Sequence, residues 1–371
     1  MSLFRFPRTI YFQRDIVDSL SEILSKEGIR RVLIITDRVL LGLIGDRIER
    51  ALGTLERDYF TDVSPEPSVD QIRKAASNFI GKEYDAVMAI GGGSVIDFSK
   101  AVAVLISSPE ADLTAISPFE SIGLKTKLIA IPPTSGTGRD VSFGVVLSDR
   151  DGKIAMGNYD LVPEIDILDS SLTPLEKKII VPTGIDAFVH SFEAIASNTS
   201  TVFTDALAER AIENIFKNLK GALDNDENAK DIMHISATMA GIAFSNSGTA
   251  AAHALGHSFG ATFHVTHGTS VGLFLVPTIK YNSQDPQTRE KYLRVCRILD
   301  AHNIDSLTKV IEDFFTGVGQ PIRVKDLGIN RDEYESKLEN MVALSLRDSE
   351  LAFNPVLMGE EDLRKLFLET Y

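Results

Sequence analysis

Residues 86–105 read AVMAIGGGSVIDFSKAVAVL, and this stretch decides the fold class. The apolar run Ala86–Ile90 predicts a buried strand, and the helical period of Ser94–Leu105 predicts a helix that begins directly after three glycines. A strand, a glycine turn and a helix in this order are typical of α/β domains with a parallel sheet. We therefore expect an α/β domain around this unit.

The glycine turn Gly91–Gly93 is also a candidate pyrophosphate site. Backbone without side chains lets phosphate oxygens approach the amide groups at the positive end of the helix that follows. Ile96 stands where the ordinary Rossmann fingerprint has its last glycine, so the spacing differs from that motif. The alternative is a strand-to-helix turn that binds nothing.

The alternation of strands and helices continues on both sides of this unit. Further strands are predicted at Arg31–Thr36, Asp58–Asp62 and Lys127–Ile131, and further helices at Leu41–Leu52 and Val69–Ile80. These elements predict a doubly wound, parallel α/β domain over residues 1–173 that binds a dinucleotide. Two strand-like stretches flank a polar turn and predict a hairpin added to the same sheet, Val141–Ser148 and Lys153–Asn158.

The pattern changes after about Thr173, where strand signals stop and helical periodicity continues to the C-terminus. One example is a single apolar helix face formed by Leu207, Ala211, Ile215, Phe216 and Leu219. We therefore predict an all-helical second domain over residues 174–371, with the active site in the cleft between the two domains.

Composition excludes several classes of protein. The chain has 371 residues, 44% of them hydrophobic, and 38 basic against 52 acidic residues give a net charge of −14. This composition is typical of globular proteins, and the negative charge argues against nucleic acid and membrane surfaces as partners. No uncharged apolar run is long enough to span a membrane, and no signal peptide precedes the first domain, so we expect a cytoplasmic protein. The single cysteine, Cys296, excludes an internal disulfide and is interpreted as a core thiol.

Two other segments have the chemistry of a nucleotide site. The stretch 132–138, PPTSGTG, follows the strand Lys127–Ile131 with small and hydroxyl-bearing residues. Asp37 ends the strand Arg31–Thr36, where its carboxylate can bind ribose hydroxyls and repel a 2′-phosphate. Taken alone, Asp37 fits a helix cap better than a ribose ligand, because aspartate is favoured at helix caps.

The histidines indicate a second site. Six of the seven lie between residues 190 and 267. Asp186 and His190 are four residues apart, as are His253 and His257, so each pair lies on one face of a helix. Three imidazoles and one carboxylate suit a divalent ion such as Fe²⁺ or Zn²⁺. His234 has no partner at ligand spacing and is interpreted as a packed or surface residue, whereas the role of His264 stays open.

Four motifs together resemble the iron-dependent, group III alcohol dehydrogenases: GGGSVIDFSKA, PPTSGTG, GIDAFVHSFE, and HALGHSFG with a following HG. The resemblance covers essentially the whole chain in order. It implies four metal ligands, Asp186, His190, His253 and His267, with His257 as an additional imidazole beside the metal. It also implies a nicotinamide-nucleotide cleft at Gly92, Gly93, Ser94, Asp97, Thr134, Ser135 and Lys153, with Asp37 at the ribose.

The chain departs from the family pattern in two places. Arg139-Asp140 follows GTG where the family commonly has Ser-Glu, and Pro182-Thr183-Gly184-Ile185 replaces smaller residues before the metal aspartate. Neither change removes a ligand. Arg139 lies beside the expected coenzyme cleft and can alter contacts with coenzyme or substrate.

The implied activity is reversible hydride transfer between a small alcohol and a nicotinamide, catalysed by an NAD(P)-dependent oxidoreductase. The metal acts as a Lewis acid on the substrate oxygen. His257 either relays the alcohol proton to solvent or only orients and packs, because an imidazole suits both roles. Fe²⁺ is expected on family likeness, with Zn²⁺ possible in its place. NAD(H) is expected over NADP(H) because of Asp37, although the adjacent Arg38 can partly neutralise that charge.

Other functions use related chemistry. A lyase of the dehydroquinate synthase type binds NAD and a metal but uses the nucleotide transiently, and a hydroxyacid-oxoacid transhydrogenase never releases it. A non-catalytic metal-binding protein leaves the glycine turn unexplained. Family likeness also predicts a homodimer or a larger homo-oligomer. The sequence does not identify the alcohol or aldehyde.

Overall fold

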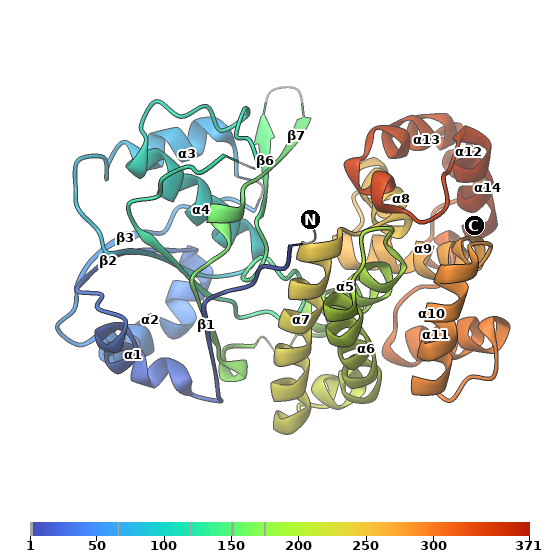
Figure 1. Ribbon diagram of the computed structural model, residues 1–371, viewed down its shortest axis with the longest axis horizontal. Coiled ribbons are helices and arrows are strands. Elements are labelled where there is room, and N and C mark those ends of the chain that lie inside the picture. Colours follow the sequence, from blue (N-terminus) through green and yellow to red (C-terminus); the bar gives the residue numbers. More distant parts are fainter. Residues whose placement is uncertain (1–2, 66, 119, 150–151, 174–175) are drawn as a thin grey trace. The chain divides into compact units, whose positions relative to one another are not determined.

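The protein is described by a computed structural model that covers residues 3–65, 67–118, 120–149, 152–173 and 176–371 (Figure 1). The chain divides into two compact units. One is Arg5–Pro174, called here the N-terminal unit, and the other is Leu175–Tyr371 together with Met1–Phe4, called the C-terminal unit.

A six-stranded sheet forms the centre of the N-terminal unit, with the strand order β1-β8-β5-β4-β2-β3 and parallel pairing throughout. Its strands are β1 (Thr9–Phe12), β2 (Arg31–Thr36), β3 (Glu56–Phe60), β4 (Ala86–Ile90), β5 (Lys127–Ile131) and β8 (Ile165–Leu168). Its helices are η1 (Ile16–Ser19), α1 (Leu20–Lys26), α2 (Arg38–Leu52), α3 (Val69–Ala76), α4 (Gly93–Ser107), η2 (Tyr159–Leu161) and η3 (Ser170–Leu172).

Helices cover both faces of this sheet because its central strands are apolar on both sides. Leu33 and Val87 pack in one core with α3 and α4, whereas their neighbours Val32 and Met88 pack in another core with α1 and α2. Figure 1 shows these two helix pairs on opposite sides of the strands. The doubly wound architecture predicted from the sequence is confirmed.

Three predicted strands, β2, β4 and β5, have the bounds expected from the sequence, and β3 begins two residues earlier. The strands β1 and β8 were not predicted. Each has only four residues, and the buried Asp166 interrupts the apolar run of β8.

The prediction that the hairpin extends the main sheet is wrong. Its strands β6 (Gly144–Asp149) and β7 (Gly152–Gly157) form their own antiparallel sheet. β6 packs against α3 and α4, and the N–H of Val146 donates to the Asp97 carboxylate at 2.9 Å. Helix α4, rather than an edge strand, therefore supplies the surface on which the hairpin rests.

All regular elements described in the C-terminal unit are helices, as the sequence predicts. They are α5 (Lys177–Ala196), α6 (Val202–Leu223), α7 (Glu227–Ser247), α8 (Ala251–Phe263), α9 (His267–Asn282), α10 (Pro286–Ile298), α11 (Ile304–Val318), η4 (Val324–Leu327), α12 (Arg331–Ser336), α13 (Leu338–Arg347), η5 (Ser349–Phe353) and α14 (Glu360–Thr370). Helices α5, α6 and α7 pack side by side (Figure 1). Cys296 is buried in this core, as expected.

Helix α5 is the one helix among the described residues that is long and apolar enough to cross a membrane. Its most apolar segment is 83% buried against the rest of the protein, as in the core helix of a globular protein. The same helix carries the buried polar side chains Asp186, His190 and Glu193. Its apolar surface is therefore used for packing around a polar site.

Candidate functional site

Three helices of the C-terminal unit bring four predicted ligands together. Asp186 and His190 lie on one face of α5, His253 lies on α8, and His267 is the first residue of α9. Gly268 makes the approach of α9 to α5 possible, because a Cβ atom there would lie 1.8 Å from the carbonyl oxygen of Pro182. No side chain fits at this position.

The imidazoles of three predicted ligands surround one carboxylate oxygen of the fourth, Asp186 Oδ1. The Nε2 atoms of His267, His253 and His190 lie 3.2, 3.6 and 3.7 Å from Asp186 Oδ1. One ligand atom from each of the four residues can be chosen so that all lie within 4.8 Å of one another. Ligand atoms bound about 2.1 Å from one tetrahedral ion are about 3.4 Å apart. The observed spacing therefore fits a divalent metal ion better than direct hydrogen bonds.

Two buried polar atoms of this cluster lack hydrogen-bond partners in the part of the chain that the structure describes. Asp186 Oδ1 and His253 Nε2 are buried and have no hydrogen-bond partner among the described residues. Burial alone would raise the pKa of Asp186, but the imidazoles of His190 and His267 outweigh burial and hold that pKa well below its usual value. An ionised carboxylate and buried lone pairs form a donor set suited to a cation. The side chain of His267 is 45% exposed, which leaves one side of the cluster open.

Glu193 binds His253 at Nδ1, the ring nitrogen that does not face Asp186, and the sequence analysis did not identify it. Its carboxylate accepts a hydrogen bond from the Nδ1 of His253 at 2.5 Å and another from the N–H of Ala252 at 2.5 Å. Burial disfavours a charged imidazole, yet Glu193 and Asp186 raise the pKa of His253 to about 10. When a cation displaces the second proton of this imidazole, the proton that stays is the one on Nδ1, which Glu193 holds, and Nε2 presents its lone pair to the cluster. The missed signal was spacing, because Glu193 follows Asp186 by seven residues and His190 by three on the same helix face.

His257 lies at the edge of the cluster, one helical turn after His253. Its ring stacks on that of His267 with centroids 5.2 Å apart, and its Nδ1 lies 2.7 Å from Asp348 Oδ2. Its side chain is 40% exposed. His264, whose role the sequence left open, is the C-cap of α8 and is not one of the four clustered residues. His234, interpreted as a packed or surface residue, is buried in α7.

Three of the predicted nucleotide residues, Gly92, Gly93 and Ser94, lie at the start of α4. Gly92 is the N-cap, no side chain caps the helix, and a Cβ at Gly92 would meet nothing within 4 Å. This open space with helix amide groups at its base fits a phosphate. Ser94 donates to the carbonyl oxygen of Pro65 at 2.5 Å, and Ser135 is buried.

Three further predicted residues lie in different surroundings. Asp97 is 3% exposed, and its carboxylate holds the hairpin by accepting from Val146. Asp37 is the N-cap of α2 and accepts from the N–H of Leu40 at 2.8 Å, so the helix-cap interpretation is correct for one of its oxygens. The side chain of Lys153 lies outside the described residues.

Lys100 is a second residue that the sequence analysis missed. It is 1% exposed, and its ammonium group donates to the carbonyl oxygens of Arg139, Ser142 and Gly144 at 2.8, 2.7 and 3.2 Å. Burial lowers its pKa to about 8. The three hydrogen bonds fix the segment that follows PPTSGTG against α4.

Comparison with known proteins gives concordant results for both units. The sequence profile described as iron-containing alcohol dehydrogenase matches residues 7–170, and that of the C-terminal part of the Fe-containing alcohol dehydrogenase family matches residues 180–371. An alcohol dehydrogenase of Thermococcus barophilus is 34% identical over 85% of each chain. An NADPH-dependent butanol dehydrogenase of Clostridium saccharobutylicum is 30% identical over 99% of this chain and 97% of that protein.

Some relatives are longer. Aldehyde-alcohol dehydrogenase 2 of Entamoeba histolytica is 30% identical over 99% of this chain, which spans only 46% of that protein. The chain thus spans about half the length of several curated relatives that it matches.

Solved structures agree in fold. The iron-containing alcohol dehydrogenase of Thermococcus thioreducens superposes with a TM-score of 0.92 at 29% identity, covering 100% of this chain and 99% of that one. A sulfoacetaldehyde reductase of Bifidobacterium kashiwanohense, solved in complex with NAD⁺, has a TM-score of 0.87 at 25% sequence identity. The superposition covers 100% of this chain and 98% of the reductase chain. With profiles matching both units and the fold shared along the whole length, the chain belongs to the iron-containing alcohol dehydrogenase family.

Proposed function

We propose that this protein is a metal-dependent alcohol dehydrogenase that transfers hydride reversibly between a small alcohol or aldehyde and a nicotinamide coenzyme. The observation that carries the proposal is the convergence of three imidazole nitrogens on Asp186 Oδ1 at 3.2–3.7 Å. We assign the metal to the C-terminal unit and the coenzyme to the N-terminal unit. Family membership supports both assignments.

We assign Fe²⁺ to the cluster, with Asp186, His190, His253 and His267 as its ligands. When bound, such an ion supplies Lewis acidity to the substrate oxygen. The protein's own contribution is orientation and charge. Asp186 supplies the one negative ligand, and Glu193 fixes the His253 ring so that Nε2 faces the ion. Zn²⁺ accepts the same ligands and is the expected contaminant of a purified sample.

We assign NAD(H) as the preferred coenzyme, bound at Gly92, Gly93 and Ser94 and completed by Asp97, Thr134, Ser135 and Lys153. Asp37 stands at the end of β2, where its charge opposes a 2′-phosphate. Arg38 forms an ion pair with Asp62 at 3.3 Å, so it has a partner other than Asp37. Among relatives, one structure contains NAD⁺ and one enzyme is NADPH-dependent. We expect kcat/KM to favour NAD(H) by about tenfold to a hundredfold, and equal values would refute the preference.

We assign proton transfer to His257. Its Nδ1 is held by the Asp348 carboxylate, and its partly exposed ring stacks on the ligand His267. This arrangement places one imidazole between a ligand and solvent. If His257→Ala left turnover and the pH–rate profile unchanged, the assignment would be wrong.

The proposed activity is tested with protein reconstituted with Fe²⁺ under anaerobic conditions. A panel of small aldehydes and alcohols is added with free NADH or NAD⁺, and absorbance of the reduced nicotinamide is followed. Steady consumption of free coenzyme is expected; a lyase or a transhydrogenase that retains its nicotinamide would show none. Sedimentation of the same sample tests the proposed homodimer or larger assembly.

A further inference from the structure

Arg139 is the residue with which this chain departs from the family pattern beside the coenzyme turn, and its surroundings have a specific shape. A Cβ on Gly93, the first residue of α4, would lie 3.3 Å from Arg139 Cγ. A Cβ on Gly144, the first residue of β6, would lie 3.1 Å from Arg139 Nη1. The Arg139 side chain therefore runs from the glycine turn to the start of the hairpin, through space that two glycines leave open.

The main chain of Arg139 is held by the side chain of Lys100. Its carbonyl oxygen accepts from the buried ammonium group of Lys100 at 2.8 Å, and the same ammonium group binds two more carbonyl oxygens of this segment. A segment tied at three points loses little additional freedom when a ligand binds. Arg139 is thus held in place before any coenzyme arrives.

The guanidinium group is oriented but keeps donors for a ligand. Its Nε lies 3.7 Å from the buried carboxylate of Asp97, which is an ion-pair distance too long for a hydrogen bond. Within the described residues, no hydrogen bond of the guanidinium group is found, and the side chain is 28% exposed. The Lys100 ammonium group is another charge near this guanidinium group. Lys100 in turn interacts electrostatically with the carboxylate of Asp140. A half-buried, oriented guanidinium group is well suited to pair with an anionic oxygen.

We infer that Arg139 is a coenzyme-binding residue that pairs with the diphosphate of the nicotinamide dinucleotide at the Gly92–Ser94 turn. The inference rests on the proposed function, because it takes this turn as the coenzyme site. The contact adds a side-chain cation to the backbone amide groups at the start of α4. The diphosphate is favoured over an acidic group of the substrate because Cγ of Arg139 lies beside Gly93, the residue that begins α4, so that the side chain starts at the glycine turn.

The test measures binding of NADH to the metal-loaded protein by fluorescence titration, without turnover. Arg139→Gln should weaken NADH binding by about tenfold, and Arg139→Lys, which keeps the charge but loses the planar fork, by less. Arg30→Gln is the matched control. It removes the same charge from an exposed position in the same unit, one residue before the amino end of β2, whereas the glycine turn follows the carboxyl end of the parallel neighbour β4. This control should bind NADH as the wild type does.

Two further ligands locate the contact. Arg139→Gln should weaken binding of ADP, which contains the diphosphate, and leave binding of adenosine unchanged. Equal NADH affinity in Arg139→Gln and wild type would overturn the inference, as would an equal loss for ADP and adenosine. A rise in KM confined to acidic aldehydes, with NADH affinity unchanged, would also overturn it and assign Arg139 to the substrate. If the wild type itself does not bind NADH, the proposed function is wrong. If the wild type binds NADH and Arg139→Gln binds it equally well, only the inference about Arg139 is wrong.

Discussion

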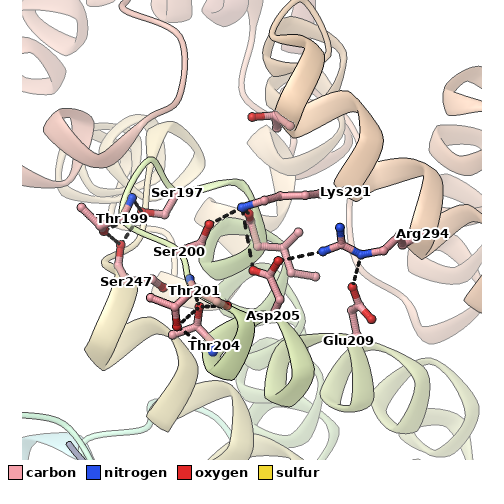
Figure 2. Close-up of polar contacts among 12 residues, drawn as sticks. Ser197, Thr199, Ser200, Thr201, Thr204, Asp205, Glu209, Ser247, Lys291 and Arg294 are labelled. Atoms are coloured by element: carbon pink, nitrogen blue, oxygen red, sulfur yellow. Dashed lines mark hydrogen bonds and ion pairs between the residues drawn. The ribbon is translucent and has the colours of Figure 1, made fainter. Parts of the chain in front are cut away.

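Two polar clusters in the C-terminal unit differ in how their buried charges are satisfied. Figure 2 shows the first, in which Lys291 and Arg294 of α10 meet Asp205 and Glu209 of α6. Arg294 donates to Asp205 at 2.7 Å and to Glu209 at 2.6 Å, while Lys291 donates to the carbonyl oxygen of Ile195 at 3.0 Å. Two cations face two carboxylates, so the charges of this cluster are paired, and Asp205 Oδ1, which has no hydrogen-bond partner among the described residues, has the Lys291 ammonium group at 3.8 Å.

The second cluster, around Asp186, has a carboxylate and three imidazoles but no lysine or arginine among its four members. Its polar atoms face one another at 3.2–3.7 Å, and two buried ones lack hydrogen-bond partners within the described part of the chain. The charges between α6 and α10 are thus paired with one another, whereas the four residues around Asp186 form a donor set that could hold a cation from solution. Substitutions in the two clusters should therefore respond differently to metal.

The largest effect is expected from His253→Ala, which removes one ligand and the hydrogen-bond partner of Glu193. Loss of about 4 kcal/mol of charge stabilisation in the transition state corresponds to about a thousandfold lower kcat/KM. Turnover is measured with Fe²⁺ in excess. Activity above a tenth of wild type would remove His253 from the ligand set.

A smaller effect is expected from Glu193→Gln, which keeps the shape of the side chain but removes the charge that orients His253. Metal affinity should fall by about tenfold to a hundredfold. The matched control is Glu209→Gln in the cluster between α6 and α10, which should leave metal affinity unchanged. Competition with a chelator gives both affinities, and equal losses in the two variants would erase the distinction between the clusters.

Asp205→Asn should lower stability without touching the metal. It leaves Arg294 and Lys291 short of one negative charge in a mostly buried position, at a cost of about 1–2 kcal/mol, or a few degrees in Tm. Thermal unfolding is followed with and without Fe²⁺. The stabilisation given by the ion should be the same in variant and wild type; a reduced stabilisation would show that the two clusters are coupled.

The smallest effect on stability is expected from Asp166 in the N-terminal unit. Its buried carboxyl oxygens have no hydrogen-bond partner among the described residues, whereas those of the nearby Asp169 have several. Both are fully buried, but Asp169 accepts hydrogen bonds from the N–H groups of Asp15, Val17 and Ser171 at 2.9, 3.1 and 2.9 Å. Burial and the neighbouring Asp140 carboxylate raise the pKa of Asp166 well above its usual value. The folded protein therefore keeps a proton that the unfolded chain loses above about pH 4, so this carboxyl stabilises less as pH rises.

Asp166→Asn should be close to neutral near pH 4 and should become stabilising relative to wild type as pH rises through the folded pKa. Calorimetric unfolding between pH 4.5 and 9 measures the difference. Asp169→Asn is the control and should cost about 2 kcal/mol, because it weakens satisfied hydrogen bonds. A difference between Asp166→Asn and wild type that does not change with pH would contradict the assigned proton.

The sequence was informative where one local pattern decides the structure. Apolar runs predicted β2, β4 and β5, and pairs four residues apart predicted which side chains share a helix face. The sequence was uninformative where contacts between distant segments determine the local structure. Nothing local shows that β6 rests on α4, that Lys100 binds three carbonyl oxygens, or that Asp166 is buried within a strand. Glu193 lies between these cases, because its spacing was visible but its partner His253 is 60 residues away.

Metal analysis of purified, reconstituted protein tests the central claim most directly. We expect one divalent ion per wild-type chain, weakened binding in Asp186→Asn, and loss of the ion in His267→Ala. His264→Ala should retain it, since His264 lies outside the four clustered residues. Loss of metal in His264→Ala together with retention in His267→Ala would contradict the account.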